Sequence, residues 1–245
     1  MADATAGCLA GRVALITGAS RGIGAAVAKR LAAAGAHTVL AARTVGGLEE
    51  VNDEICRRGG SATLVPIDLR NATLIDQLGA ALFERYGKLD ILVANAAILE
   101  SLGPVAHSDV GHWERVMSVN LMANYRLIRS LDPLLRASDA GRAIFVTADA
   151  ARRATAYWAP YAVSKAALET LVLTYAAELT KSPVRVNLID PGTVATALRA
   201  RAFPGEDPAT LPTPDQVTDA FLALADPACQ THGEIITVTR PAPIS

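Results

Sequence analysis

The 245-residue chain lacks an excess of charge, a disulfide pattern and a long apolar run. Its formal net charge of −1 gives no support to a nucleic-acid or acidic-membrane partner. No apolar stretch approaches the roughly 18 residues that a membrane-spanning helix needs. The three cysteines, Cys8, Cys56 and Cys229, are odd in number and far apart, which is typical of reduced thiols in a cytoplasm.

The sequence also lacks a targeting segment and a metal-ligand cluster. Residues Met1–Thr5 show neither the charged nor the apolar region of a signal peptide, so we expect a cytoplasmic protein. The four histidines have no ligand-like spacing, so we expect no bound metal. A chain of this length commonly forms one doubly wound unit. We therefore expect a single domain over residues 1–245, with its core at 10–240.

Strand-like and helix-like segments alternate along the chain, with no low-complexity linker and no internal repeat. We expect strands at 12–17, 37–42, 61–66, 90–94, 142–147, 184–189 and 234–238. We expect helices at 22–34, 46–58, 71–86, 110–136, 158–180 and 214–225. This alternation predicts an α/β fold, a doubly wound Rossmann-type parallel sheet of about seven strands with helices on both faces. Its ligand crevice would lie at the carboxyl ends of the strands.

A glycine-rich turn, from Thr17 to Gly24, stands between the first predicted strand and the first predicted helix. That context is typical of dinucleotide binding, although a plain strand-to-helix turn is the alternative. Gly18 allows the tight turn, Gly22 lets the backbone approach a pyrophosphate, and Gly24 lets the helix pack close to the strand. The N–H groups at the start of the helix would then point at the phosphates.

Tyr161 and Lys165 lie four residues apart, ahead of an apolar stretch. On a helix, that spacing puts both side chains on one face, about one turn apart. An ammonium group beside a phenol favours the phenolate and lowers the pKa of the tyrosine, as a proton-transfer residue requires. The pair alone occurs by chance in many helices, and the glycine-rich turn is what makes it informative.

With both motifs present, the chain resembles the short-chain dehydrogenase/reductase family, in its common single-domain form, from about residue 10 to about residue 240. The resemblance implies a catalytic set in which Tyr161 is the acid/base, Lys165 lowers its pKa and holds the ribose, and Asn120 supports a proton-relay water. It implies cofactor contacts from Gly18, Ser20, Arg21, Gly22, Ile23, Gly24, Arg43, Asp68, Leu69, Asn95, Lys165, Pro191, Gly192, Val194 and Thr196. It also implies the strand order 3-2-1-4-5-6-7 and a rather short substrate-covering loop at 195–213.

The end of the second predicted strand indicates which nucleotide is preferred. NAD-selective enzymes place a carboxylate about 20 residues beyond the glycines, where it contacts the ribose hydroxyls. Here that place holds Ala42, followed by Arg43. A guanidinium binds a phosphate through two charge-assisted hydrogen bonds, and Arg21 would add a second positive charge. We expect NADP(H) to be preferred over NAD(H); the alternative is a pair of solvated surface arginines.

One departure from the family pattern bears on the chemistry. Counting back from Tyr161, the position of the family's catalytic serine is Ala148. Losing such a donor commonly costs about 2.7–4 kcal/mol of transition-state stabilisation. Thr147 is expected on the opposite face of the strand, unless the strand has ended or bulged there. Asp149 is expected to be a solvated loop residue or a helix cap, and Ala97 adds a methyl group near the expected cofactor wall.

Two functional classes follow. The first is an NADP(H)-dependent oxidoreductase that transfers a hydride between the nicotinamide and a small carbonyl or secondary alcohol. The second is a nucleotide-binding protein of the same fold with little or no turnover, acting as a regulator or an assembly partner. The intact residues Tyr161, Lys165 and Asn120 favour the first, and Ala148 favours the second.

The predicted helices near 110–136 and 158–180 carry apolar residues on more than one face. In the second helix, Leu168, Leu171, Val172 and Tyr175 are expected in the core, which leaves Ala162, Ala166 and Leu173 for another surface. The family resemblance, in which these helices pair across a two-fold axis, favours a homodimer or a homotetramer.

Overall fold

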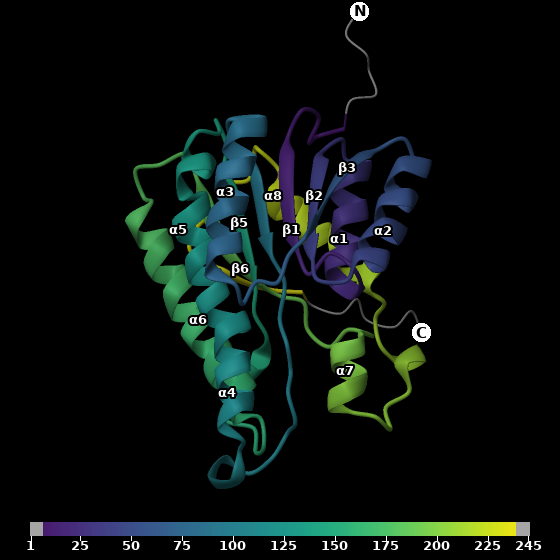
Figure 1. Cartoon of the computed structure of the whole chain (residues 1–245), viewed down its shortest axis with the longest axis vertical. Helices are drawn as coiled ribbons and strands as arrows, with labels where there is room; N and C mark the ends of the chain where they lie inside the picture. Colours follow the sequence, from purple (N-terminus) through teal and green to yellow (C-terminus); the bar gives the residue numbers. More distant parts are fainter. Residues whose placement is uncertain (1–6, 239–245) are drawn as a thin grey trace, which may run out of the picture.

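The computed structural model describes residues 7–238, which form one seven-stranded parallel sheet between two layers of helices (Figure 1). The strand order is β3-β2-β1-β4-β5-β6-β7, as expected from the family. The strands are β1 (Val13–Thr17), β2 (His37–Ala42), β3 (Ser61–Pro66), β4 (Ile91–Ala94), β5 (Arg142–Val146), β6 (Arg185–Asp190) and β7 (Ile235–Thr237). The predicted Rossmann-type fold is confirmed.

Two apolar layers flank the sheet, because the central strands are buried on both faces. One layer packs against α1 (Gly22–Ala33), α2 (Val45–Arg57) and α8 (Thr218–Ala225). The other packs against α3 (Ala72–Tyr86), α5 (Ala123–Arg136) and α6 (Ala159–Glu178). All parallel strands end at the same edge, so the loops after them gather at the lower end of the sheet in Figure 1.

Three predicted segments differ from the structure. The expected helix at 110–136 is divided into α4 (Val110–Met117), a π-helical turn (Ser118–Met122) and α5. Such turns add a residue to the helix and are frequent at functional sites. The segment Pro214–Val217 is a 3₁₀ turn before α8, and the loop at 195–213 contains a short helix, α7 (Ala197–Ala202), that was not expected. In Figure 1, α7 lies apart from both helical layers.

The structure bears on the expectations about membrane helices and metal ligands, but it does not describe the N-terminal segment. Within residues 7–238, no helix is both long and apolar enough to cross a membrane. Over the same residues, the acidic, histidine and cysteine side chains form no group of three that would hold a metal ion. The segment Met1–Thr5 lies outside the described residues.

Candidate active site

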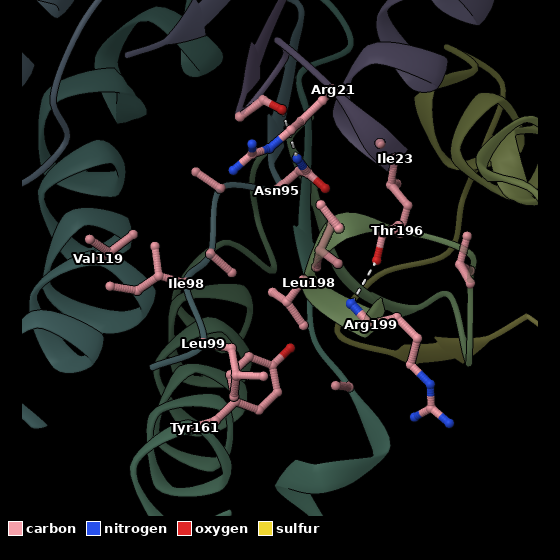
Figure 2. Close-up of a pocket in the computed structure, with 18 of the residues that line it drawn as sticks. Arg21, Ile23, Asn95, Ile98, Leu99, Val119, Tyr161, Thr196, Leu198 and Arg199 are labelled. Atoms are coloured by element: carbon pink, nitrogen blue, oxygen red, sulfur yellow. Dashed lines mark hydrogen bonds between the residues drawn. The ribbon is translucent and has the colours of Figure 1, made fainter. Parts of the chain in front are cut away.

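A cavity of about 400 Å³ opens where the strands end. Residues that follow β1, β2, β3, β4, β5 and β6 line it, together with Tyr161 and Lys165 of α6. Every expected site residue lines this cavity except Gly24 and Asn120, which lie behind it. Arg21 and Asn95 lie at one end of the cavity, and Tyr161 with Leu99 at the other (Figure 2). The sequence motifs therefore meet in one place.

The glycine-rich turn has the geometry that its sequence predicts. Gly18 has a φ of 67°, in the left-handed region that favours glycine. A Cβ atom on Gly24 would lie 2.3 Å from the carbonyl oxygen of Gly18, so only glycine lets α1 approach the strand this closely. Asn95 holds the turn from β4, because its Nδ2 donates to the carbonyl oxygen of Thr17 at 2.9 Å. The spacing of these glycines is explained by the close approach of the backbone at Gly24 to the backbone at Gly18.

The start of α1 fits a pyrophosphate. No side chain caps this N-terminus, and its first turn carries no acidic residue, so its free N–H groups face the cavity without a competing anion. Gly22 has a φ of 58°, and a Cβ atom there would point towards Thr196 across the cavity. These features form the cradle that a dinucleotide phosphate requires.

Two cations, Arg21 and Arg43, line the cavity on the side away from Tyr161. Arg43 follows the last residue of β2, Ala42, and Arg21 precedes α1; both arginines are exposed and line the cavity. Over residues 7–238, neither guanidinium has an ion-pair partner within 4 Å. Asp68 is engaged by Arg70, whose guanidinium hydrogen-bonds it and holds the pKa of that carboxyl below its usual value. Asp68 is therefore paired, whereas Arg21 and Arg43 keep their positive charge free.

Tyr161 and Lys165 are both buried at the far end of the cavity. The Lys165 Nζ lies 5.8 Å from the centre of the Tyr161 ring and donates to the carbonyl oxygen of Val146 at 2.7 Å. Burial raises the pKa of Tyr161, and the carboxylates of Asp190 and Asp149 raise it further. Burial lowers the pKa of Lys165 to about 8, against the opposing effect of Asp190 and Glu169.

These directions differ from the sequence-based expectation that Lys165 lowers the pKa of Tyr161. The reason is desolvation, which penalises the charged form of both groups and is the largest cause of both shifts.

Asn120 lies in the π-helical turn and is fully buried. Its Oδ1 accepts from the Ile98 amide at 2.9 Å, and its Nδ2 donates to the Ile98 carbonyl oxygen at 3.0 Å and to Ser164 Oγ at 3.1 Å. The side chain thus joins the loop after β4 to α6. In this arrangement Asn120 positions the cavity wall and the helix of Tyr161.

Neither neighbour of Ala148 supplies the missing hydroxyl. Strand β5 ends at Val146, and the Thr147 Oγ1 donates to Glu169 Oε1 at 2.7 Å on α6. Asp149 is exposed, and its carboxylate lies 3.7 Å from Arg153. Ala148 itself lines the cavity. Among the described residues that line the far end, Tyr161 carries the hydroxyl left for a substrate oxygen, and the indole N–H of Trp158 is a second donor without a partner.

A charged network lies beside the catalytic pair, and sequence reasoning did not find it. The guanidinium of Arg152 donates through Nη1 to Glu169 Oε1 and through Nη2 to Asp190 Oδ2. Asp190, at the end of β6, is buried, and its Oδ1 also accepts from the Gly192 amide at 3.0 Å. Arg152 therefore pairs two carboxylates whose charge reaches Tyr161 and Lys165. Two sequence features could have indicated this network: Asp190 ends the apolar strand β6, and Glu169 follows Lys165 by one helical turn.

Trp158, Leu99 and Leu198 also line the cavity and were not expected. Trp158 precedes Tyr161 by one helical turn, a spacing that places both on one face. Leu198 belongs to the unexpected helix α7, whose contacts depend on a loop conformation that the sequence does not define.

Comparison with known proteins decides the family. Residues 12–207 match the model of the short chain dehydrogenase family. The chain belongs to this family. It is 37% identical over 216 residues to the oxidoreductase YciK of Escherichia coli K12, covering 87% of this chain and 85% of that protein.

Solved structures of short-chain dehydrogenases share the fold along nearly the whole chain. One from Shigella flexneri, complexed with NADP, has a TM-score of 0.91 and 34% identity, covering 95% of this chain and 98% of that one. Another from E. coli CFT073, complexed with NADPH, has a TM-score of 0.88 and 35% identity, with coverage of 94% and 97%. This short-chain dehydrogenase is thus an enzyme of the oxidoreductase kind.

Arg152→Met is expected to shift the pH dependence of this short-chain dehydrogenase. Without the guanidinium, Asp190 loses a counter-charge, and together with Asp149 it favours the neutral phenol of Tyr161 over its anion. If Tyr161 is the proton donor in carbonyl reduction, the phenol must carry its proton, so the rate falls as pH rises through its pKa. That falling limb should move to higher pH by roughly one unit.

The rising limb of alcohol oxidation, which needs the phenolate, should move in the same direction. Profiles of kcat against pH in both directions measure the shift, with Arg57→Met, at an exposed position on α2, as the matched control. A limb that stays in place, or moves to lower pH, would refute this role of Arg152.

Proposed function

We propose that this short-chain dehydrogenase is an NADP(H)-dependent oxidoreductase that transfers a hydride between the nicotinamide and a small carbonyl or secondary alcohol. The observation that carries the proposal is the single cavity that joins an uncapped helix N-terminus and two unpaired arginines to the buried pair Tyr161 and Lys165. The relatives complexed with NADP and NADPH add support for the nucleotide.

The chain's own residues have distinct roles in the proposed reaction. A bound NADPH supplies the hydride to the carbonyl carbon. Tyr161 donates its proton to the substrate oxygen in reduction and takes it back in oxidation, and Lys165 beside it holds the ribose and stabilises the phenolate. Asn120 positions Ile98 and α6 around the reacting atoms. The turn from Gly18 to Gly24, with Asn95 and the segment 191–196, holds the nucleotide.

The nucleotide preference is tested at Arg43. If Arg43 and Arg21 bind a 2′-phosphate, NADPH should bind at least about tenfold more tightly than NADH, which corresponds to about 1.4 kcal/mol. Arg43→Ala should remove most of that difference, and salt should weaken NADPH binding more than NADH binding. Fluorescence titration of both nucleotides measures it, with Arg57→Ala in α2 as the control. Equal affinities in the parent protein would contradict the proposal.

A second candidate is a nucleotide-binding protein of the same fold without significant turnover. Ala148 favours it, because the cavity offers the substrate oxygen one donor fewer than the family pattern. A screen of NADPH consumption against aldehydes, ketones and quinones separates the two candidates. Tight NADPH binding with no turnover of any compound would favour the second candidate.

We further propose a homodimer or homotetramer that pairs through α5 and α6. Met122, Tyr125 and Val163, on or next to these helices, are exposed apolar side chains. The helix faces differ from expectation in two respects. Leu173 packs against the core, whereas Leu171 is half-buried outside it. Ala162, expected at another surface, packs against the apolar cluster around Tyr161. Light scattering at micromolar concentration should give a dimer or larger. Val163→Glu should shift it towards monomer, whereas Phe83→Glu, at an exposed position on α3, should not.

Three remaining predictions belong with this proposal. Residues 10–240 act as one dinucleotide-binding domain that carries the active site. The segment 195–213, which contains α7, covers the substrate. A cytoplasmic location stays a prediction from the cysteine spacing and the sequence of the N-terminus.

A further inference from the structure

An apolar cluster surrounds Tyr161, separate from the two main cores. Leu99, Ala150 and Tyr161 are its buried members, and Leu102, Ala148, Trp158, Ala162, Leu198 and Ala202 pack against them. In Figure 2, Leu99 lies beside the Tyr161 ring and Leu198 points towards the phenol oxygen, whereas the Arg199 guanidinium extends away. The space in front of the proton donor is therefore walled by hydrocarbon.

Trp158 joins the helix of Tyr161 to the covering segment. Its ring meets the Tyr161 ring edge-on, with centroids 5.8 Å apart at 72°, and the Phe203 ring at 5.8 Å and 33°. The Arg199 guanidinium lies 3.7 Å from the Phe203 ring centre, on the outer side of this stack. Of these three rings, those of Trp158 and Tyr161 line the cavity, and Phe203 connects Trp158 to the covering segment.

The charged and hydroxyl side chains near this end of the cavity have partners within the chain. Arg199 makes two hydrogen bonds to Glu206, at 2.6 and 2.7 Å, and the Thr147 hydroxyl is donated to Glu169. Arg201, at the mouth, lies 3.6 Å from Glu100. Within residues 7–238, no buried side-chain nitrogen or oxygen lacks a partner. Among the described side chains at this end, the Tyr161 hydroxyl and the Trp158 indole N–H make no hydrogen bond, and the leucine and alanine side chains of the wall offer a substrate no polar group.

We propose that this end of the cavity takes an uncharged carbonyl compound, or the corresponding alcohol, whose remaining surface is apolar and rests on Leu99, Trp158 and Leu198. This inference rests on the proposed function and specifies its substrate class. Sugars, hydroxy acids and other compounds with a second polar group beside the carbonyl are excluded from it.

The physical reason is the difference between burying hydrocarbon and burying an unpaired polar group. Each methylene group that leaves water strengthens binding about fourfold. A hydroxyl buried without a partner weakens binding by roughly tenfold or more. Ala148 strengthens the discrimination, because a serine hydroxyl there would offer a second hydrogen bond to a polar substrate.

The test compares kcat/KM with NADPH for aldehydes matched in their number of non-hydrogen atoms. Pentanal is paired with glyceraldehyde, and hexanal with 4-oxobutanoate, which carries a carboxylate. The apolar member of each pair should be preferred by at least about tenfold. From propanal to hexanal, kcat/KM should rise about threefold to fourfold per methylene until the space is filled.

A pair of variants shows whether the wall selects the substrate. Leu198→Ser should lower the ratio of kcat/KM for pentanal to that for glyceraldehyde by roughly fivefold. Leu74→Ser, on the exposed face of α3, should leave the ratio unchanged. NADPH affinity, measured for each variant, shows that the nucleotide end is intact.

The outcomes separate this inference from the function beneath it. A preference for glyceraldehyde or 4-oxobutanoate, or a ratio insensitive to Leu198→Ser, would overturn the apolar substrate and leave hydride transfer standing. An enzyme that binds NADPH and reduces none of these aldehydes, nor any ketone or quinone, would overturn the proposed function and the inference with it.

Discussion

Tyr161→Phe is expected to reduce kcat for carbonyl reduction by roughly 10³-fold while leaving NADPH affinity nearly unchanged. The phenol is buried at the end of the cavity, and no other described side chain there is free to protonate a substrate oxygen. General acid–base catalysis by a positioned group typically contributes about 10²–10⁴-fold, so its removal should cost that much. The ring stays in place, so its packing against Trp158 and Leu99 is kept.

Steady-state kinetics with hexanal and fluorescence titration with NADPH measure the two quantities separately. Tyr157→Phe is the matched control, because Tyr157 is 58% exposed and does not line the cavity. Removal of the phenol should also remove the pH dependence that Tyr161 causes. If Tyr161→Phe keeps more than a tenth of the parent kcat, another group transfers the proton.

The fold was predictable because its determinants are local. Alternating apolar runs and helical stripes identified each strand to within one residue at either end, and the glycines of the first turn indicated a loop that lines the cavity. Gly24 is informative in sequence because a backbone contact of 2.3 Å for an added Cβ admits no other residue. A steric requirement of this kind restricts a single position to glycine, so it can be recognised in the sequence.

The electrostatics of the site were not predictable in the same way. The pKa of Tyr161 depends on burial and on Asp190, and Asp190 is paired by Arg152, which comes from a different loop. These contacts join residues far apart in the sequence, so they cannot be predicted from the spacing of a local motif. The wall at Leu198 depends likewise on α7, a helix of six residues inside a covering segment. Its position follows from tertiary packing rather than from intrinsic helix propensity.

Ala148→Ser is expected to raise kcat/KM towards a reactive carbonyl by up to about a hundredfold. Ala148 lines the cavity in an extended conformation, just beyond the end of β5, where a hydroxyl would reach the space in front of Tyr161. Thr147 does not already fill the role, because its hydroxyl is donated to Glu169. The gain should appear mainly in kcat, since the added hydrogen bond strengthens as charge develops on the substrate oxygen.

Thr147→Val provides the control for this prediction. If Thr147 serves only Glu169, the valine variant should lose stability but respond to Ala148→Ser as the parent does. A fall in activity on Ala148→Ser would mean that the serine disturbs a group already placed for the substrate. Turnover by neither the parent nor the serine variant, with NADPH bound by both, would favour the nucleotide-binding protein. A gain confined to polar substrates would show that Ala148 sets substrate choice rather than rate, because the new hydroxyl would then pair with a second polar group.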